Sequence, residues 1–237
     1  MKKNLKITSL ALVLVLVLAM LAGCGAAKDT DPASSAYVTI TNQAELAAAK
    51  DGSLMAAVAI EIPADGSTVG DVIKLAHEKY FTDGASGFAT TTTEWGDSIT
   101  KLWGVENGGS YGYYVNGAMS YGLTDPVKAG DRVDIMIYKD AATFSDVYTY
   151  VDAKANGTSV TATVEALGFD ENWNPKMAAL AGAKIYYTDG KKLTDTGAVT
   201  GEDGTATFTL KAGTYRIVSI AQDGLYSVSA QKIVVSK

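Results

Sequence analysis

The amino-acid sequence predicts a β-rich protein in which an α+β domain, residues 37–142, precedes an all-β sandwich, residues 143–237. Composition is the first reason, because 24 glycines and 13 tyrosines accompany many threonines, a bias typical of strands and turns. The second reason is that turn dipeptides such as Asn116-Gly117 separate short β-prone runs. The third is that few stretches repeat apolar residues at helical spacing.

The first 24 residues are typical of an exported, lipid-anchored protein. Lysines at positions 2, 3 and 6 precede an apolar run, residues 10–20, that is short for a membrane span. Leu-Ala-Gly-Cys follows at residues 21–24 and resembles the lipobox of bacterial lipoproteins, in which the cysteine becomes lipidated. We therefore predict a signal peptide, residues 1–23, and lipidation at Cys24. The alternative is an ordinary secretory signal with an incidental cysteine.

Cys24 is the only cysteine in the chain, so it has no partner for a disulfide or a thiolate metal site. Residues 24–36 are small and polar and are predicted to form a flexible tether. Two acyl chains on the cysteine would hold the protein firmly on a membrane. The predicted localisation is therefore extracytoplasmic, with a lipid anchor in the bacterial cell membrane.

Charge and motifs narrow the function. Removal of the leader, with its three lysines, changes the formal net charge from −6 to −9. This acidity argues against nucleic acid as a partner and against electrostatic docking on anionic lipid. The chain holds one histidine, His77, and no nucleophile-elbow, zinc-protease or phosphate-loop motif. We expect no enzyme activity, no resident cofactor and no metal, although a catalytic pair among the 26 acidic residues stays open.

The first domain is predicted to place one helix on several strands. Residues 54–62 indicate a largely buried strand, and Ser67 or Thr68 is the expected helix N-cap. His77 lies at the edge of the helix's apolar face and is expected to be solvated or half-buried, the other hypothesis being a metal or cobalt ligand. That face is formed by Val69, Val72, Ile73, Ala76 and Tyr80. Further strands are expected at residues 88–93, 98–103 and 133–138.

The strongest local signal is the hairpin at Asn116-Gly117, because both central positions of a two-residue hairpin need positive φ. Alternation along the preceding strand puts Tyr113 and Val115 on one face and Tyr114 and Asn116 on the other. The first of these faces is the more apolar. We therefore expect Tyr113 to cover the helix and Tyr114 to be exposed.

Four motifs of this domain occur together in order. They are Ser67-Thr68-Val69-Gly70-Asp71, Ile99-Thr100-Lys101-Leu102-Trp103-Gly104-Val105, Gly112-Tyr113-Tyr114-Val115-Asn116-Gly117 and Gly130-Asp131-Arg132-Val133. Together they resemble the transcobalamin-like C-terminal domain, a β-grasp-like module of secreted and surface proteins of Gram-positive bacteria. The resemblance implies a domain that covers one face of cobalamin. This chain has Tyr111-Gly112 where many members carry Trp-Met, and it has no helical barrel for the other face.

Residues 143–237 show recurring strand candidates with turn dipeptides between them, which indicates a β-sandwich. The candidates are residues 147–153, 159–166, 183–187, 205–211, 214–221 and 226–235. Residues 200–208 with 212–215 resemble the immunoglobulin-like, prealbumin-like or Cna protein B-type surface repeats. Residues 168–181 are expected to be a long insertion, either a binding element or a surface crossover with Trp173 packed against the sheet.

Three functions remain open. The first is capture of a small ligand, a corrinoid or another flat molecule, by aromatic residues of the first domain. The second is adhesion or another interaction at the cell surface. The third is a structural or accessory role beside a transporter or another protein partner. The candidate ligand-binding residues are Trp95, Trp103, Tyr111, Tyr114, Asn116 and Tyr121.

Overall fold

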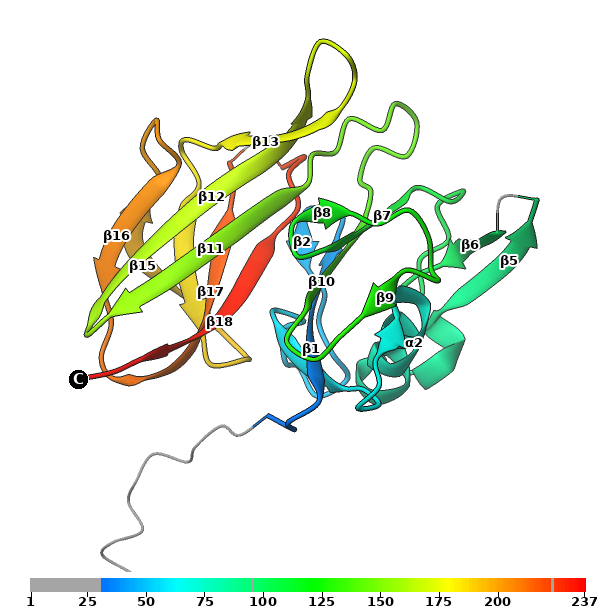
Figure 1. Ribbon diagram of the computed structural model, residues 1–237, viewed down its shortest axis with the longest axis horizontal. Helices are drawn as coiled ribbons and strands as arrows, with labels where there is room; N and C mark the ends of the chain where they lie inside the picture. The colour runs from blue at the N-terminus through cyan, green and yellow to red at the C-terminus, as the bar shows by residue number, and fades with distance from the viewer. Residues whose placement is uncertain (1–30, 95, 223) are drawn as a thin grey trace, which may run out of the picture. The chain divides into compact units, whose positions relative to one another are not determined.

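The computed structural model describes residues 31–237 except positions 95 and 223 (Figure 1). The predicted signal peptide, the lipidation site Cys24, tether residues 24–30 and Trp95 lie outside the described residues. Strands make up 51% of the structure and helix 8%, so the β-rich prediction is confirmed. The α-helix of the described part is α2 (Val69–Tyr80), and a 3₁₀ turn, η1 (Gly84–Gly87), follows it.

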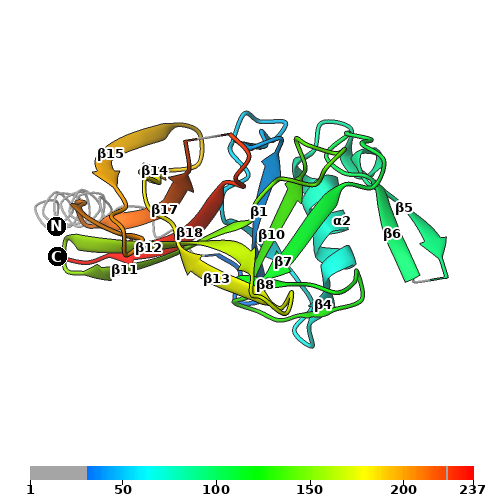
Figure 2. The ribbon, with the colours of Figure 1, turned by 90° about the horizontal axis from the view of Figure 1, so that it is seen from above.

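The first half of the chain forms a six-stranded sheet in the order β2-β1-β10-β7-β8, with β3 also paired to β1. Its strands are β1 (Ser35–Asn42), β2 (Glu45–Leu46), β3 (Val58–Glu61), β7 (Tyr111–Val115), β8 (Ala118–Met119) and β10 (Arg132–Ile137). β1 and β10 run parallel, and the other pairs are antiparallel. The helix α2 lies along one face of this sheet (Figure 2), and Val38, Ile73 and Ile135 belong to the core between them.

Local sequence explains where α2 begins and which face it buries. The Thr68 hydroxyl accepts a hydrogen bond from the Asp71 N–H at 3.2 Å, which confirms the predicted N-cap. Val69, Val72, Ile73 and Ala76 are fully buried, as their spacing predicts. Two small strand pairs complete this half: β4 (Ser67–Thr68) with β9 (Pro126–Val127), and β5 (Ala89–Thr93) with β6 (Gly96–Lys101).

The second half of the chain forms two four-stranded sheets that share a core. One sheet contains β11 (Thr149–Asn156), β12 (Ser159–Phe169), β13 (Pro175–Ala179) and β16 (Thr205–Thr209). The other contains β15 (Leu193–Val199), β14 (Lys184–Thr188), β17 (Gly213–Ile220) and β18 (Ser229–Val235), in that order. Val151 and Val164 from the first sheet meet Ile185 and Ile217 from the second in one buried cluster.

Three features of the strand arrangement differ from the sequence prediction. β1 begins at Ser35, which is buried, so the tether cannot extend to residue 36 as expected. The expected insertion, residues 168–181, contains the strand β13. The strand β15 was not predicted at all. Both β13 and β15 are largely exposed, so neither carries the apolar alternation by which strands are recognised in a sequence.

Residues 31–237 form one compact unit, and buried contacts join the two halves. The ring of Tyr114 in β7 stacks on that of Tyr148 with 3.6 Å between centroids. The Tyr148 hydroxyl donates a hydrogen bond to the Asp134 carboxylate of β10 at 2.7 Å. The boundary near residue 142, and independent folding of its two sides, stay predictions.

Candidate functional site

The structure separates the candidate ligand-binding residues into exposed and buried groups. Tyr121 is 89% exposed, whereas Trp103 and Tyr114 are 6% and 4% exposed. Tyr111 is half-buried and Asn116 is exposed. The five candidates that the structure describes therefore do not form one aromatic surface. Only Tyr121, among those described, offers a free ring to a ligand.

Trp103 belongs to the core, together with His77. The Trp103 backbone N–H donates to His77 Nε2 at 2.8 Å, and the indole N–H donates to the Ala48 carbonyl at 3.1 Å. His77 is fully buried, and its Nδ1 lies 2.8 Å from the Ile73 carbonyl. Because Nε2 accepts, Nδ1 carries the proton and the ring is neutral. The expectation of a solvated or half-buried histidine is wrong, because Phe81 and Trp103 cover the ring.

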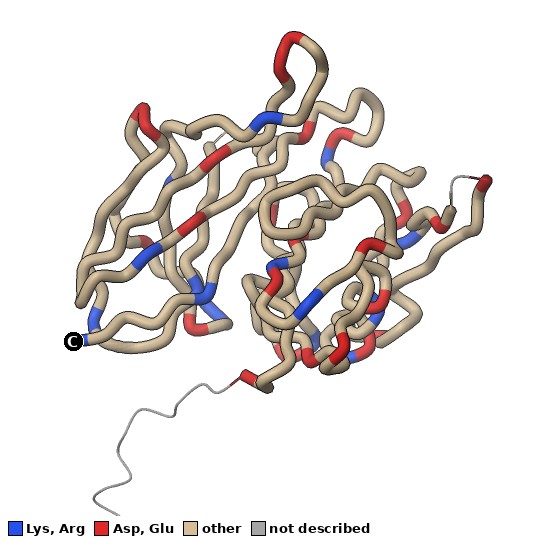
Figure 3. The backbone as a smooth tube through the Cα atoms, viewed as in Figure 1, with Lys and Arg blue, Asp and Glu red and all other residues tan. Residues whose placement is uncertain are grey.

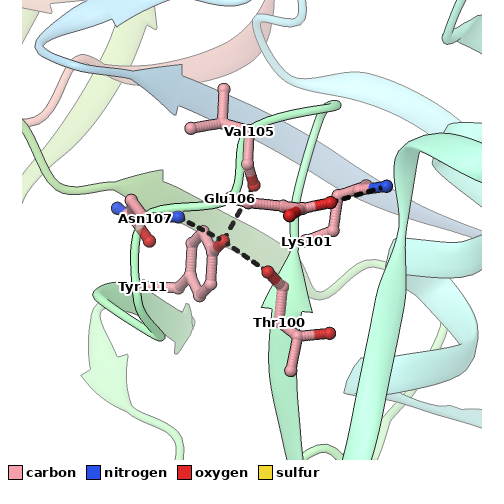
Figure 4. Close-up of polar contacts among 6 residues, drawn as sticks. All are labelled: Thr100, Lys101, Val105, Glu106, Asn107 and Tyr111. Carbon is pink, nitrogen blue, oxygen red and sulfur yellow. Dashed lines mark hydrogen bonds and ion pairs between the residues drawn. The ribbon is translucent and has the colours of Figure 1, made fainter.

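Tyr111 holds the loop after β6 (Figure 4). Its hydroxyl lies 2.8 Å from the Val105 carbonyl oxygen and 3.1 Å from that of Thr100, and it accepts the Asn107 N–H at 3.3 Å. Burial is the main reason why the pKa of Tyr111 is raised, so the phenol stays protonated and donates to one carbonyl at a time. We conclude that Tyr111 positions this loop.

Tyr114 is on the face that the sequence predicts, but the expectation that it is exposed is wrong. Alternation does place Tyr113 and Val115 toward the α2 side, where they pack on the core. The opposite face is covered by Tyr148, the residue just before β11, so the Tyr114 ring is buried there. Burial raises the pKa of Tyr114 far above its ordinary value. A buried ring cannot be the contact surface for a ligand.

Asn116 has a structural task at the hairpin turn. Its φ is +52°, as the turn requires. The side-chain oxygen accepts the Arg132 N–H at 2.9 Å, and the side-chain nitrogen donates to the Asp131 carboxylate at 2.8 Å. These bonds tie the β7–β8 turn to the start of β10 and leave the amide group little freedom to recognise a ligand.

Tyr121 lies beside a cleft of about 320 Å³ between β6 and the segment that follows β8. The cleft is open to solvent. Asp97 and Ser98 line it from β6, and Tyr113 lines it from β7. The walls on the other side include Tyr121, Thr124 and Asp125. This volume is at the lower end of the range for small-molecule sites.

The loop that carries Tyr121 is held in place by Asp125. The Asp125 carboxylate accepts the Ser120 hydroxyl and the Tyr121 N–H, both at 2.7 Å. These bonds, with the Ser120 bond the larger cause, lower the pKa of Asp125, so the carboxylate is ionised at neutral pH. The Val69 N–H also donates to the Asp125 carbonyl at 3.0 Å, which fixes the loop to the start of α2. Tyr121 is thus exposed on an anchored loop.

Tyr113 is the cleft residue that sequence reasoning assigned to the core alone. It packs on the core and also lines the cleft. Burial, and to a smaller extent the nearby Asp125 charge, raise the pKa of Tyr113. Its hydroxyl therefore stays protonated and can donate a hydrogen bond. No signal in the sequence could show that one side of this ring meets a cleft, because the facing segment is eight or more residues further along the chain.

The cleft offers hydrogen bonding and aromatic contact. Tyr113 and Tyr121 can each donate through a hydroxyl, and Asp97 and Asp125 accept. The Asp97 carboxylate already accepts the Thr92 hydroxyl at 2.7 Å. Among the described residues, no three His, Cys, Asp or Glu side chains gather as a metal site would require. The arrangement suits a neutral or cationic molecule with polar edges.

A second exposed aromatic residue lies outside this cleft. Trp173, in the β12–β13 turn, is 82% exposed, so the interpretation that it packs against the sheet is wrong. Its φ is +62°, a conformation that a tryptophan adopts at a cost. The Asp170 carboxylate accepts the N–H groups of Asn172 and Asn174 and holds the turn.

Comparison of the chain with protein-family models, curated proteins and solved structures found no match. The resemblances to transcobalamin-like and prealbumin-like domains therefore rest on the sequence motifs alone. Within the described part of the chain, no helix is long and apolar enough to span a membrane.

Proposed function

We propose that this protein is a non-enzymatic, membrane-anchored lipoprotein of a Gram-positive bacterium that binds a small ligand outside the cytoplasm. One observation carries the proposal. The solvent-open cleft is lined by Tyr113 and Tyr121, and the loop of Tyr121 is fixed by Asp125. An aromatic side chain with few rotatable bonds on an anchored loop loses little conformational freedom on binding, which favours affinity.

The size and chemistry of the cleft limit the ligand. A volume of about 320 Å³ accommodates a small molecule, or one edge of a larger one such as a corrinoid. Nucleic acid is disfavoured as a partner, because Figure 3 shows lysine and arginine positions interspersed with aspartate and glutamate. The helix α2 against a sheet with parallel β1 and β10 supports the β-grasp-like assignment of this half. The shared core of the two later sheets supports an immunoglobulin-like sandwich.

Replacement of Tyr121 by alanine is expected to weaken ligand binding by about 1–3 kcal/mol, or roughly 5- to 150-fold. The probes are cobinamide and cobalamin, titrated into residues 31–237, the compact unit, and followed by calorimetry. Tyr121→Phe is the matched control, because it keeps the ring and removes only the hydroxyl. If neither cobinamide nor cobalamin binds, corrinoids are excluded as the ligand. Equal affinity of native protein and Tyr121→Ala would place the site elsewhere.

Lipid anchoring is the second part of the proposal, and it is supported by the Leu-Ala-Gly-Cys sequence that ends at Cys24. Cys24→Ala is expected to abolish acylation and to release the protein from membranes or leave its leader uncleaved. Fractionation and mass spectrometry of the N-terminal peptide check this. A native N-terminal peptide without acyl chains, in a protein that still sediments with membranes, would contradict it.

A second candidate function is an interaction at the cell surface through Trp173. The observation that favours it is a strained, 82% exposed tryptophan on a hairpin held by Asp170. Exposed tryptophan is enriched where interfaces gain most of their energy. The titration with cobinamide and cobalamin distinguishes the Trp173 surface from the Tyr121 cleft. Trp173→Ala is expected to leave corrinoid binding in the cleft unchanged.

A further inference from the structure

The strand β3 has one free edge. It pairs with β1 through Ser35 to Val38 and with no other strand of the described chain. The Ile62 N–H donates to the Ser34 carbonyl at 2.9 Å, so residue 62 points its backbone groups toward β1. In an antiparallel pair these directions alternate, so Ile60 also points toward β1. Ala59 and Glu61 therefore present their N–H and C=O groups on the opposite side.

A groove runs along this free edge. A cavity of about 730 Å³ is lined by Ile60 to Pro63 and, from α2, by Leu75, Glu78 and Lys79. The side chains of Ile60 and Glu61 point to opposite faces of the sheet, so a cavity that touches both lies at the edge of the strand. A second hollow of about 290 Å³ shares Pro63, Leu75 and Glu78 with the first. The second hollow extends the groove along α2 to Asp71.

The backbone groups on this edge decide which kind of molecule fits. Two residues with free N–H and C=O groups can form up to four hydrogen bonds with another extended backbone. The groove beside them can take an apolar side chain against Leu75. Among the described residues no strand covers the free edge of β3; the strand is four residues long, its last residue is the exposed Glu61, and Pro63 lies just beyond it. An extended peptide satisfies both the backbone groups and the groove.

The charged side chains that line the groove indicate which kind of peptide it would bind. The groove carries the carboxylates of Glu61, Asp71 and Glu78 against the amines of Lys74 and Lys79. Three carboxylates against two amines give the groove a formal net charge of −1. The formal net charge of the whole chain is also negative, −6. We propose that the groove between β3 and α2 binds an extended, basic segment of a partner protein as an added strand. This site is independent of the Tyr121 cleft.

The experiment uses the full chain in detergent micelles and a phage-displayed library of random peptides as the probe. Selected peptides are expected to be rich in lysine and arginine and to bind the native chain. Ala59→Pro should weaken them about tenfold or more, because it removes an outward N–H and places a ring on the edge. Its N–H does not bond β1, so pairing inside the sheet is kept. Ala59→Val is the matched control and should bind within about twofold of native.

Hydrogen exchange gives a readout that a merely structural change would not reproduce. Peptide binding should slow exchange at the Ala59 and Glu61 amides and leave Ile60, already bonded to β1, unchanged. Failure to select any peptide, or equal binding by Ala59→Pro, would overturn the proposal. Protection of both amides before peptide is added would show that another part of the chain covers the edge. Protection that rises with protein concentration would show that a second copy covers it. Either result would also overturn the proposal.

Discussion

Replacement of Arg132 by methionine is expected to lower the free energy of unfolding by about 3–5 kcal/mol. Arg132 is 8% exposed. It donates from Nη1 to the Val151 carbonyl at 2.7 Å and from Nη2 to the Ala230 carbonyl at 3.0 Å. Its guanidinium also lies over the Tyr150 ring, 4.0 Å from the centroid. One side chain of β10 thus satisfies backbone groups of both later sheets.

The loss is large because the buried carboxyl of Asp134 also depends on the Arg132 charge. Asp134 lies two residues along the same face of β10 and is 4% exposed. Burial raises the pKa of Asp134, and the Arg132 charge opposes that rise. Without the guanidinium, Asp134 keeps the Tyr148 hydroxyl but loses its compensating charge. The buried carboxyl must then take up a proton or bear the cost of desolvation.

Urea unfolding of residues 31–237 measures the effect. Lys154→Met is the matched control, since Lys154 is an exposed cation whose partner is Asp152, 2.8 Å away, and little change is expected. Combining Arg132→Met with Asp134→Asn should cost less than the sum of the single variants, because no charge is then left unpaired. A loss below about 1 kcal/mol for Arg132→Met would show that the pair contributes little.

His77→Ala is expected to destabilise the fold by about 3–5 kcal/mol at pH 7.5, as truncation of a buried ring does. His77 is fully buried against Phe81, Phe88 and Trp103. Its removal leaves a cavity and takes the acceptor from the Trp103 N–H. Lys79→Ala, an exposed position of the same helix, is the control and should change stability little.

The effect of His77 should also depend on pH. Burial lowers the pKa of His77 in the folded protein below the value of 6.5 expected in the unfolded chain. Below pH 6.5 the unfolded chain therefore binds a proton that the folded chain does not, so stability falls as pH falls. The largest slope from one such group is about 1.4 kcal/mol per pH unit. The His77→Ala variant lacks this contribution.

Unfolding curves between pH 5 and 8 test this dependence. The difference in stability between native protein and His77→Ala should narrow as pH falls from 6.5 toward 5, because only the native protein loses the histidine contribution. Above pH 6.5 the difference should be constant. A difference that stays constant over the whole range would mean that His77 titrates alike in both states.

The helix and the hairpin turn could be predicted from local sequence. Thr68 caps α2, and the turn at Asn116 has the positive φ that its dipeptide indicates. These features depend on residues within a few positions of one another, and short-range sterics and hydrogen bonding decide them. The β13 strand and the β15 strand could not be recognised, because exposure on both faces removes the pattern.

The cleft and the buried charges depend on segments far apart in the chain. Alternation in β7 correctly separates Tyr113 and Val115 from Tyr114, but it does not say what covers the second face. The sandwich half covers it, so Tyr114 is buried. Tyr121, by contrast, is exposed on the anchored loop after β8. Sequence by itself determined the β-rich class, the helix and the two faces of β7, because these follow from local geometry. Only the tertiary structure decided which faces meet water, because burial depends on contacts that no local pattern encodes.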